Sequence, residues 1–582
     1  MKDRGACLPF ALIQASRACC WVLLSCGVAQ AAGAAPLPFT EEAIARGINY
    51  TIEQMGTFGC GVAFADLDGD GDPDLITLGK ATTGPLIPWT AGIYENDGAG
   101  VFTNRSIGNG IPAMPMATGI TAADYDGDGD LDLYFSNWLL PNVLMRNDGG
   151  FQFTDVSQVA GVDDPGAGSG CGWGDYDGDG WLDFYLANRT ATNHPEPPYT
   201  PSTEQNRLYH NLGDGTFEEV AEARGVTDGD ARSFQGAFFD YDRDGDADLY
   251  LSNDKGLSSG CTWRNHLWEN VGGSFQDVSQ ASGTNGCIEA MCIAIGDFDD
   301  NLFPDIYVTN LPVGNPLYLN QGDGTFLEFS QQAGVASNLT GWGSVFFDFN
   351  NDEHLDLYVC NHSAPNRLYN FTGQWPAVDL ANDLAVADAG PGMSFCAATA
   401  DIDNDGDLDL AVSSRSTPTA TGRIYLFINH EGQMRRWVKF NVIGQGRNVF
   451  GVGAQVDIRI GAIWRMREVI AGSGFKSQDD LTLHFGLGDA TMVDEVRITW
   501  PGGTTRTLEN VAANQTYPLF PPERLGDGNG DGDIDSDDAA VFVAVLTGAE
   551  TGTNQVAVND FNGDGATDGL DIPAFVSAML QP

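Results

Sequence analysis

Short runs of alternating apolar and polar residues fill most of the chain, and clusters of Gly, Asn and Asp separate them. Runs such as DLYFSN and DIYVTN are rich in aromatic and β-branched residues, which favour strands. The Gly, Asn and Asp clusters between the runs are typical of tight turns, which connect antiparallel strands. The pattern therefore predicts a mainly β protein.

The β-rich runs recur at regular intervals. Seven segments open on an aspartate-rich stretch, continue into a β-rich run and an N-x-L-(Tyr/Trp/Met) motif, and close on an Asn-Gly turn and a Phe. Their first aspartates are 51 to 65 residues apart. Units of this length with about four strands each are typical of propeller blades. We predict a seven-bladed β-propeller over residues 40–432, then a small β-sandwich or barrel, then a small α-helical module.

Each unit carries a loop with oxygen side chains at positions 1, 3, 5 and 9, usually with Gly at position 6. Alternate positions on a tight loop direct their carboxylates to one centre, and Gly permits the sharp turn. Several hard oxygen ligands with three or four negative charges favour Ca²⁺ over Mg²⁺. The predicted ligands of blades 1 to 4 are Asp66, Asp68, Asp70, Asp74; Asp124, Asp126, Asp128, Asp132; Asp175, Asp177, Asp179, Asp183; and Asp240, Asp242, Asp244, Asp248. Those of blades 5 to 7 are Asp297, Asp299, Asn301, Asp305; Asp348, Asn350, Asp352, Asp356; and Asp401, Asp403, Asp405, Asp409.

Two of the loops deviate from the pattern. Blade 5 has Asn301 and Leu302, and blade 6 has Asn350 and Glu353, where the other loops have Asp and Gly. A lost charge and a strained turn predict weaker calcium binding in these two blades. Position 12 holds a strand-forming residue, such as Thr77 in blade 1, so the loops are expected to join two strands and not two helices as in an EF-hand.

The seven loops and the motifs after them resemble FG-GAP/VCBS repeats, the calcium-loop propellers of integrin α-chains and of many exported bacterial proteins. The resemblance covers about two thirds of the chain. It implies that the calcium ions are structural, and ions that keep the blades folded outside a cell are the simplest function for these loops.

A different β-rich segment occupies residues 436–520. It resembles the ASPIC/UnbV domain that follows such propellers in proteins similar to cartilage acidic protein. His484 in this segment is a candidate catalytic base, but no nucleophile or second base is close in sequence, which favours a packed strand histidine. The matching residues are Arg447, Gly451, Gly453, Ala454, then residues 474–478 (GFKSQ), 484–488 (HFGLG) and 500–503 (WPGG).

A linker at residues 518–525 leads to two 12-residue loops in residues 526–582. Position 12 of each loop is acidic and a helical pattern follows, with an apolar face at Ile572, Phe575, Val576, Met579 and Leu580 after the second loop. The module resembles a type I dockerin, which docks onto cohesin modules; a calcium-folded tail with another partner is the alternative. The predicted calcium ligands are Asp527, Asn529, Asp531, Asp535, Asp538 and Asp560, Asn562, Asp564, Asp568, Asp571, so the chain has up to nine calcium sites.

Charge and targeting features argue against some classes of function and indicate where the protein is located. The formal net charge is −52, which disfavours binding to nucleic acid. Residues 1–31 read as a signal peptide, with lipidation at Cys26 as the alternative, and no later stretch is long and apolar enough for a transmembrane helix. We therefore expect a secreted or cell-surface protein. Cys60 and Cys396 occupy equivalent strands of blades 1 and 7, and we hypothesise a disulfide between them.

No catalytic motif stands out. Residues 256–260 fit G-x-S-x-G, but the following CTWRNHLWEN returns to strand and not to the helix that a nucleophile elbow needs. Inserted loops at residues 190–205 and 255–265 are rich in Pro, Tyr, Trp and His, which suits a carbohydrate or protein site as well as variable surface loops. We expect an exported, non-enzymatic, calcium-dependent adhesion or binding protein whose partner is a protein (cohesin-like or on a surface), a polysaccharide, or both. The alternative is a polysaccharide-degrading lyase or hydrolase, or an accessory protein of a cellulosome-like assembly.

Overall fold

A computed structural model describes residues 38–49, 51–52, 61–78, 91–189, 205–256, 258–311, 314–387, 392–415, 422–528, 534, 538–549, 552–561, 563 and 566–579. The predicted signal peptide, Cys26, Cys60 and the 190–204 insertion lie outside these residues. The predicted ligands Asn529, Asp531, Asp535, Asn562 and Asp564 lie outside them as well.

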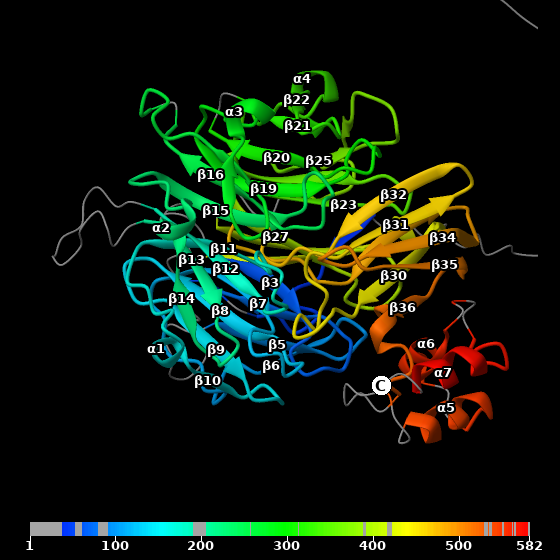
Figure 1. Ribbon diagram of the computed structural model, residues 1–582. Helices are drawn as coiled ribbons and strands as arrows, with labels where there is room; N and C mark the ends of the chain where they lie inside the picture. The colour runs from blue at the N-terminus through cyan, green and yellow to red at the C-terminus, as the bar shows by residue number, and fades with distance from the viewer. Residues whose placement is uncertain are drawn as a thin grey trace, which may run out of the picture. The chain divides into compact units, whose positions relative to one another are not determined.

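Residues 39–429 form repeated four-stranded antiparallel sheets of the kind typical of a propeller (Figure 1). The first three sheets are β3 (Val62–Ala65), β4 (Asp74–Thr77), β5 (Gly92–Asn96), β6 (Phe102–Asn104); β7 (Ala117–Ala123), β8 (Asp132–Asn137), β9 (Val143–Asn147), β10 (Phe153–Asp155); and β11 (Gly168–Gly174), β12 (Asp183–Asn188), β13 (Arg207–Asn211), β14 (Phe217–Glu219). The next two are β15 (Arg232–Phe239), β16 (Asp248–Asp254), β17 (His266–Asn270), β18 (Phe275–Asp277); and β19 (Ala290–Gly296), β20 (Asp305–Asn310), β21 (Leu317–Asn320), β22 (Phe326–Glu328).

The sixth and seventh units form one larger sheet because a single residue pair, His362 with Met393, joins a strand of one unit to a strand of the other. The sixth unit is β23 (Thr340–Phe347), β24 (Asp356–His362), β25 (Arg367–Asn370) and β26 (Val378–Asp379). The seventh is β27 (Met393–Ala400), β28 (Asp409–Arg415) and β29 (Gly422–Asn429), and its fourth strand is β1 (Phe39–Glu41) from the other end of the chain. A short strand, β2 (Thr51–Ile52), also pairs with β29.

The first strands of successive units contact one another in cyclic order, and β27 of the seventh unit contacts β3 of the first. In units 2 to 6, the second strand carries a buried tyrosine whose hydroxyl donates to a main-chain carbonyl oxygen at the end of the same unit. These pairs are Tyr134 with Val162, Tyr185 with Val226, Tyr250 with Thr284, Tyr307 with Val335 and Tyr358 with Val386. The repeat in sequence is thus a repeat in core packing and hydrogen bonding.

Four units contain a one-turn helix that the strand pattern does not predict. The helices α1 (Ser157–Ala160), α2 (Ala221–Arg224), α3 (Ser279–Ser282) and α4 (Ser330–Ala333) follow the fourth strands. Each ends at a left-handed glycine, such as Gly161 with φ 77°, which any other residue would adopt only with strain.

Residues 436–519 form two sheets, which we call the second β domain. One sheet has the order β33 (Leu483–Gly488), β30 (Arg436–Val442), β36 (Thr516–Leu519), and the other β32 (Ile463–Glu468), β31 (Gln455–Ile460), β34 (Met492–Thr499), β35 (Thr505–Ala512). The buried side chains of both sheets, among them Phe440, Val456 and Trp500, share one core that continues to Trp173 of the third repeat sheet. The predicted linker is ordered at Leu519 and in the 3-10 helix Pro522–Arg524; another 3-10 helix, Gly432–Met434, precedes the domain.

The C-terminal segment contains α5 (Asp538–Leu546), α6 (Thr553–Asn559) and α7 (Ile572–Met579). Helices α5 and α7 begin at or directly after the twelfth positions of the two predicted loops, as expected. Phe575 of α7 is buried and stacks on Phe542 of α5, with ring centroids 4.0 Å apart, whereas Ile572 and Val576 are exposed, so the predicted apolar face of α7 is only partly buried. None of the helices in the described part of the chain could cross a membrane.

The disulfide hypothesis is wrong at Cys396, which is a free, buried thiol on β27. The disulfide found in the described residues joins Cys261 and Cys287, with Cα atoms 5.2 Å apart. It ties the segment after β16 to the segment before β19. A disulfide is typical of proteins in oxidising compartments, which agrees with an extracellular location.

Candidate metal sites and the domain that covers them

The seven aspartate loops share one conformation. In the first loop, the Asp66 carboxylate accepts hydrogen bonds from the main-chain N–H groups of Gly69, Asp70 and Gly71 at 2.9 to 3.2 Å. The bond from the position-6 N–H to the position-1 Oδ2 recurs in all seven loops at 2.9 to 3.1 Å. The first aspartate therefore shapes the loop around its own carboxylate.

Position 6 has a left-handed backbone in every loop. The loops of blades 1 to 4 and of blade 7 have Gly at position 6. The loops of blades 5 and 6 adopt the same conformation with Leu302 (φ 74°) and Glu353 (φ 83°). A side chain in this region costs about 1–2 kcal/mol. The strained turn predicted from the sequence for these two blades is thus present.

Position 3 carries the feature that points most directly to a cation. In five loops the Oδ1 atom of this aspartate is buried and accepts no hydrogen bond: Asp68, Asp126, Asp177, Asp299 and Asp403. A buried carboxylate oxygen without a donor is costly, and a bound cation would satisfy it. The donor set, which consists of carboxylate oxygens, fits Ca²⁺.

Neighbouring carboxylates converge in the loops. Ligand atoms of Asp66, Asp68 and Asp70 lie within 4.8 Å of one another. In the second, third and fourth loops, the aspartates at positions 1, 3 and 9 converge in the same way. Burial, reinforced by the neighbouring carboxylates, raises the pKa of Asp66 to about 6 and that of Asp124 to about 7. A divalent cation reverses this effect because it stabilises the ionised form.

The aspartates at position 9 also stabilise the loops through hydrogen bonds to the main chain. Asp74 is buried, and its two oxygens accept hydrogen bonds from the N–H groups of Leu67 and Asn96 at 2.9 and 2.8 Å. Asp132, Asp183, Asp248, Asp305, Asp356 and Asp409 accept the equivalent pair of bonds. These residues hold the loop against the third strand of the sheet, whether or not an oxygen also contacts a metal.

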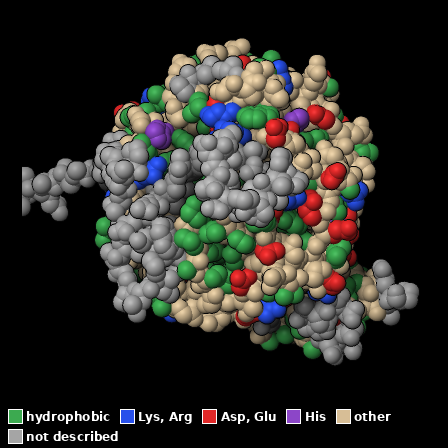
Figure 2. All heavy atoms as spheres, turned by 90° about the vertical axis from the view of Figure 1, so that its left-hand side faces the viewer, with side chains coloured by type: hydrophobic (Ala, Val, Ile, Leu, Met, Phe, Trp, Pro, Cys, Tyr) green, Lys and Arg blue, Asp and Glu red, His purple; other side chains and the backbone are tan. Residues whose placement is uncertain are grey.

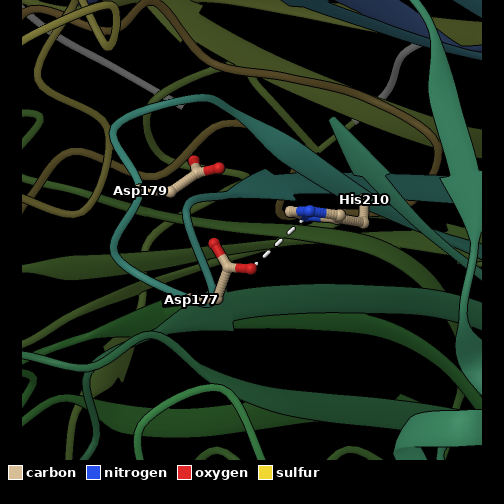
Figure 3. A group of neighbouring side chains, drawn as sticks. All are labelled: Asp177, Asp179 and His210. Carbon is tan, nitrogen blue, oxygen red and sulfur yellow. Dashed lines mark ion pairs between the residues drawn. The ribbon is translucent and has the colours of Figure 1, made fainter. Parts of the chain in front are cut away.

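The third loop has an additional polar neighbour that the sequence pattern did not single out. His210 of β13 lies with its Nδ1 atom 3.1 Å from Asp183 Oδ1. The same nitrogen lies 3.4 Å from Asp177 Oδ2 (Figure 3). The hydrogen bond to Asp183 raises the pKa of His210. Its position directly after the N-x-L-Tyr motif was the available signal.

Basic side chains of the second β domain and of the residue directly before it lie on the loops of blades 5 to 7. Arg465 pairs with Asp300 at 3.0 Å, Arg435 donates to Asn350 Oδ1 at 2.9 Å, and Lys439 donates to Asp401 Oδ2 at 2.7 Å. Within the described residues, the predicted ligands of blades 1 and 2 take part in no ion pair. Protein cations therefore offset part of the loop charge in blades 5 to 7, whereas no ion pair of the described residues offsets the charge of the predicted ligands in blades 1 and 2.

The second β domain fills the axis of the repeat sheets with the segment Ala471–Asp480, which we call the axial loop. Its main chain pairs with first strands of several units: Trp173 with Ala471, Ile293 with Gly474 and Ala63 with Gln478. Phe475 is fully buried and packs on Trp342 of β23, with ring centroids 5.2 Å apart. Further bonds join the axial loop to Ile120, Ala122, Gln235 and Thr399, so it contacts the first strand of all seven units.

Other motifs of this domain rest on the aspartate loops. His484 is buried, its Nε2 lies 3.1 Å from the Gly406 carbonyl oxygen, and burial lowers its pKa to about 3. A Cβ atom on Gly486 would lie 2.1 Å from Asp348 Oδ2, so only Gly fits there. Gly502 donates to the Gly245 carbonyl oxygen at 3.1 Å. These motifs are docking contacts, and His484 is a packed histidine, as the sequence favoured.

In the C-terminal module, the described ligand candidates are mostly buried. Asp538 and Asp571 at position 12 and Asp527 and Asp560 at position 1 are each at most 5% exposed. The two oxygens of Asp571 accept hydrogen bonds from the N–H groups of Phe561 and Asp568 at 2.9 and 2.8 Å. The Asp571 carboxylate thus joins the last position of the second loop to its second and ninth positions.

The ends of the second strands that point away from the aspartate loops carry basic and aromatic side chains. Arg189 pairs with Asp254 at 2.7 Å and lies over the ring of Phe234, and Arg232 lies over the ring of Trp263. Lys255 pairs with Glu289 at 2.6 Å. On the face seen in Figure 2, basic side chains occur in a few small groups and acidic ones are scattered, so this face is not uniformly acidic.

The G-x-S-x-G segment has no nucleophile elbow. Residues 258–265 form turns and bends without a helix, and the N–H and hydroxyl of Ser258 both donate to Glu289. Ser258 therefore faces a carboxylate that Lys255 neutralises, and not a histidine base.

Comparison with known proteins gives two family matches. FG-GAP-like repeats match at residues 86–135, 199–251, 297–359 and 348–412, and the ASPIC and UnbV model matches at residues 444–525. The chain is 24% identical to mouse cartilage acidic protein 1 over 499 residues and 25% identical to the human protein over 490 residues. These alignments cover 80% and 78% of this chain but 65% and 61% of the two relatives, that is, less than two thirds of their length.

Among solved structures, YCF48 bound to D1 peptide aligns with a TM-score of 0.38 at 8% identity, over 68% of this chain and 98% of that one. The biofilm matrix protein Bap1 of V. cholerae aligns with a TM-score of 0.32 at 11% identity, over 74% of this chain and 98% of that one. In sequence, the chain is similar to FG-GAP-like repeats and to the ASPIC/UnbV domain and is distantly similar to cartilage acidic protein 1.

Proposed function

We propose that this chain is an exported, calcium-dependent binding protein in which a seven-bladed propeller is braced by Ca²⁺ in its aspartate loops. The observation that carries the proposal is the buried position-3 oxygen without a hydrogen-bond donor, which recurs in five loops. Calcium at about ten times its Kd adds about 1.4 kcal/mol for each occupied site, so several sites together rival the stability of a whole domain.

The ASPIC/UnbV domain acts in this proposal as a cap. Its axial loop fills the propeller axis, and its Arg, His and Gly residues rest on the aspartate loops. Calcium that orders the loops therefore also orders the surface on which the cap sits. A ligand then binds away from the cap, where Arg232 over the ring of Trp263 suits an acidic polysaccharide or protein surface.

The C-terminal module supplies a protein-docking surface in this proposal. Exposed apolar side chains lie on or beside α5 and α7: Val543, Leu570, Ile572 and Val576. Apolar side chains on two adjacent helices are suited to a protein partner, and a dockerin-like use of the module accounts for them.

The experiment is a Ca²⁺ titration of chelator-treated full chain, followed by thermal unfolding and by a screen of polysaccharides for binding and cleavage. We expect a large rise in melting temperature, and capture of an acidic polysaccharide without new reducing ends or unsaturated products. Calcium-dependent product formation would replace the binding function with an enzymatic one. No response to calcium would overturn the proposal.

A matched pair of variants assigns the effect to the loops. Asp126→Asn removes the negative charge of a position-3 ligand, and Asp214→Asn removes an exposed carboxylate of a turn outside the aspartate loops. Without calcium, Asp126→Asn is expected to stabilise the protein slightly because it relieves repulsion from Asp128. With calcium, it is expected to lower the melting temperature, whereas the Asp214→Asn variant keeps the wild-type calcium response.

A further inference from the structure

We propose that the aspartate loop of the third repeat, unlike its six sister loops, binds a first-row transition-metal ion through Asp177, Asp179 and the imidazole of His210. The inference rests on the proposal that the loops bind divalent cations. It concerns which cation this one loop selects.

The strand register places a histidine at this loop alone. Phe184 of β12 pairs with Tyr209 of β13, so the next residue along β13, His210, stands opposite Asp183, the ninth position of the loop. The same register in the other sheets places different residue types opposite the ninth aspartate: Glu95, Arg146, Glu269, Leu319, Asn370 and Ile428. Among the seven equivalent positions, one in each sheet, only position 210 holds a histidine.

The geometry brings nitrogen and oxygen atoms to one centre. One ligand atom each from Asp177, Asp179 and His210 lies within 4.8 Å of the other two. Figure 3 shows the ring of His210 turned toward Asp177, with Asp179 on the same loop. The His210 Nδ1 atom, and not its Nε2 atom, faces the carboxylates at 3.1 and 3.4 Å.

The hydrogen bond between His210 and Asp183 does not satisfy every polar atom of the site. Asp183 already accepts main-chain N–H groups at both oxygens, from Asn211 at 2.8 Å and Tyr176 at 3.2 Å. In contrast, the Asp177 Oδ1 atom is buried and has no donor. The site therefore has an oxygen and a nearby nitrogen that a metal ion would satisfy together.

The donor chemistry selects the metal class. Ca²⁺ and Mg²⁺ take oxygen ligands, whereas an imidazole nitrogen suits Zn²⁺, Fe²⁺, Co²⁺ and Ni²⁺, and carboxylates suit Mn²⁺. A set of two or more carboxylates and one imidazole is thus a mixed site for a first-row transition metal. The sister loops lack an imidazole opposite the ninth aspartate, and His354 of the sixth loop is paired with Asp300 of the fifth loop at 2.6 Å. The predicted ligands of the sister loops are therefore oxygen atoms only, which suits Ca²⁺.

The test uses the full chain, treated with a chelator, loaded with excess Ca²⁺ and then given one equivalent of Mn²⁺. Bound manganese is counted by elemental analysis after dialysis against Ca²⁺, and pulsed EPR detects coupling of Mn²⁺ to an imidazole nitrogen. We expect one retained Mn²⁺ per chain with nitrogen coupling. His210→Glu, which installs the residue found at the sister positions 95 and 269, is expected to abolish the coupling and weaken Mn²⁺ retention about tenfold or more.

A second variant, which adds a site, keeps the test decisive if the His210→Glu variant does not fold. Glu269→His places an imidazole at the equivalent position of the fourth loop and, when given two equivalents of Mn²⁺, is expected to bind a second Mn²⁺ with nitrogen coupling. Absence of nitrogen coupling in the wild type, or equal Mn²⁺ retention in the His210→Glu variant, would overturn the inference. The calcium-dependent rise in melting temperature is measured on the same samples, so failure of this inference is distinguished from failure of the proposed calcium function.

Discussion

The side-chain amide of Asn96 donates a 2.8 Å hydrogen bond to the main-chain carbonyl oxygen of Ile402 and so joins the first repeat sheet to the seventh. The same bond links each of five other sheets to the loop of the preceding one: Asn147 to Leu67, Asn211 to Tyr125, Asn270 to Tyr176, Asn320 to Tyr241 and Asn429 to Phe349. The sixth sheet has Phe371 in place of the asparagine. Among these asparagine bonds, the Asn96 bond connects the first sheet of the repeat array to the last.

Loss of this bond should destabilise the whole repeat array. Asn96 is buried, and its amide also donates to the Pro73 carbonyl oxygen at 3.2 Å. Asn96→Ala leaves two buried carbonyl oxygens without this donor, which we expect to cost about 1–3 kcal/mol in the free energy of unfolding. Urea unfolding in calcium measures the loss, and Gln276→Ala at an exposed position of β18 is the control. Equal stability of the two variants would contradict the role of Asn96.

The turn at position 6 gives a second prediction. Leu302 is in the left-handed region, so Leu302→Gly should raise the free energy of unfolding by up to about 1 kcal/mol and strengthen cation binding in the fifth loop. Gly71→Ala is the matched opposite change. A Cβ atom on Gly71 meets no other atom within 4 Å, so its cost, about 1–2 kcal/mol, comes from the backbone alone. A stability change of the same sign in both variants would contradict this explanation.

The buried carboxylates predict an unusual pH dependence for the metal-free protein. Burial raises the pKa of Asp124 to about 7 and that of Asp175 to about 6. At pH 4 to 7 the folded protein therefore retains protons that the unfolded chain has lost. The free energy of unfolding of the chelated protein should fall as pH rises through this range, by up to about 1.4 kcal/mol per unit of pKa shift for each group.

Calcium should remove or reverse this trend because it binds the ionised carboxylates. Thermal unfolding from pH 4 to pH 8, with chelator and with Ca²⁺, checks both statements. The calcium-induced rise in melting temperature is expected to grow with pH. A chelated protein that gains stability toward pH 7 would contradict the assignment of these buried carboxylates.

The axial loop gives a fourth prediction. Gln478 accepts a hydrogen bond from the Ala122 N–H and donates one to the Ala122 carbonyl oxygen, both at 3.0 Å, and it is buried. Gln478→Ala leaves both main-chain groups unpaired, which we expect to cost about 2–4 kcal/mol. The cap should then loosen, and limited proteolysis should cut near residues 430–436 faster than in the wild type. Gln374→Ala, at an exposed site, is the control for both readouts.

Local features of the fold could be predicted from the sequence because the strands and turns of each repeat depend on residues close together in the chain. The alternation of apolar residues, the Asp-x-Asp-x-Asp-Gly turn and the strand residue at position 12 are short-range signals, and β3, the loop from Asp66 and β4 follow them. The strain at Leu302 and Glu353 was also predictable, since the turn needs a left-handed residue whatever the side chain is.

Contacts between distant segments did not follow from the same signals. The sequence motifs of residues 474–478 and 484–488 were recognisable, yet nothing local to them indicates that Phe475 packs on Trp342 or that Gly486 faces Asp348. The pairing of Cys261 with Cys287, and not of Cys60 with Cys396, depends on which loops meet at the edges of neighbouring sheets. The position of His210 opposite Asp183 required the strand register.

By itself the sequence determined that this protein is a mainly β chain of seven similar units with oxygen-rich loops, because strand alternation and turn chemistry act over a few residues. Only the tertiary structure decided that β1 completes the seventh sheet against β29, that the axial loop fills the axis, and that Arg465 and Lys439 lie on some loops while His210 lies on another. These choices depend on contacts between segments tens to hundreds of residues apart, where burial and hydrogen bonding, and not local propensity, select the partner.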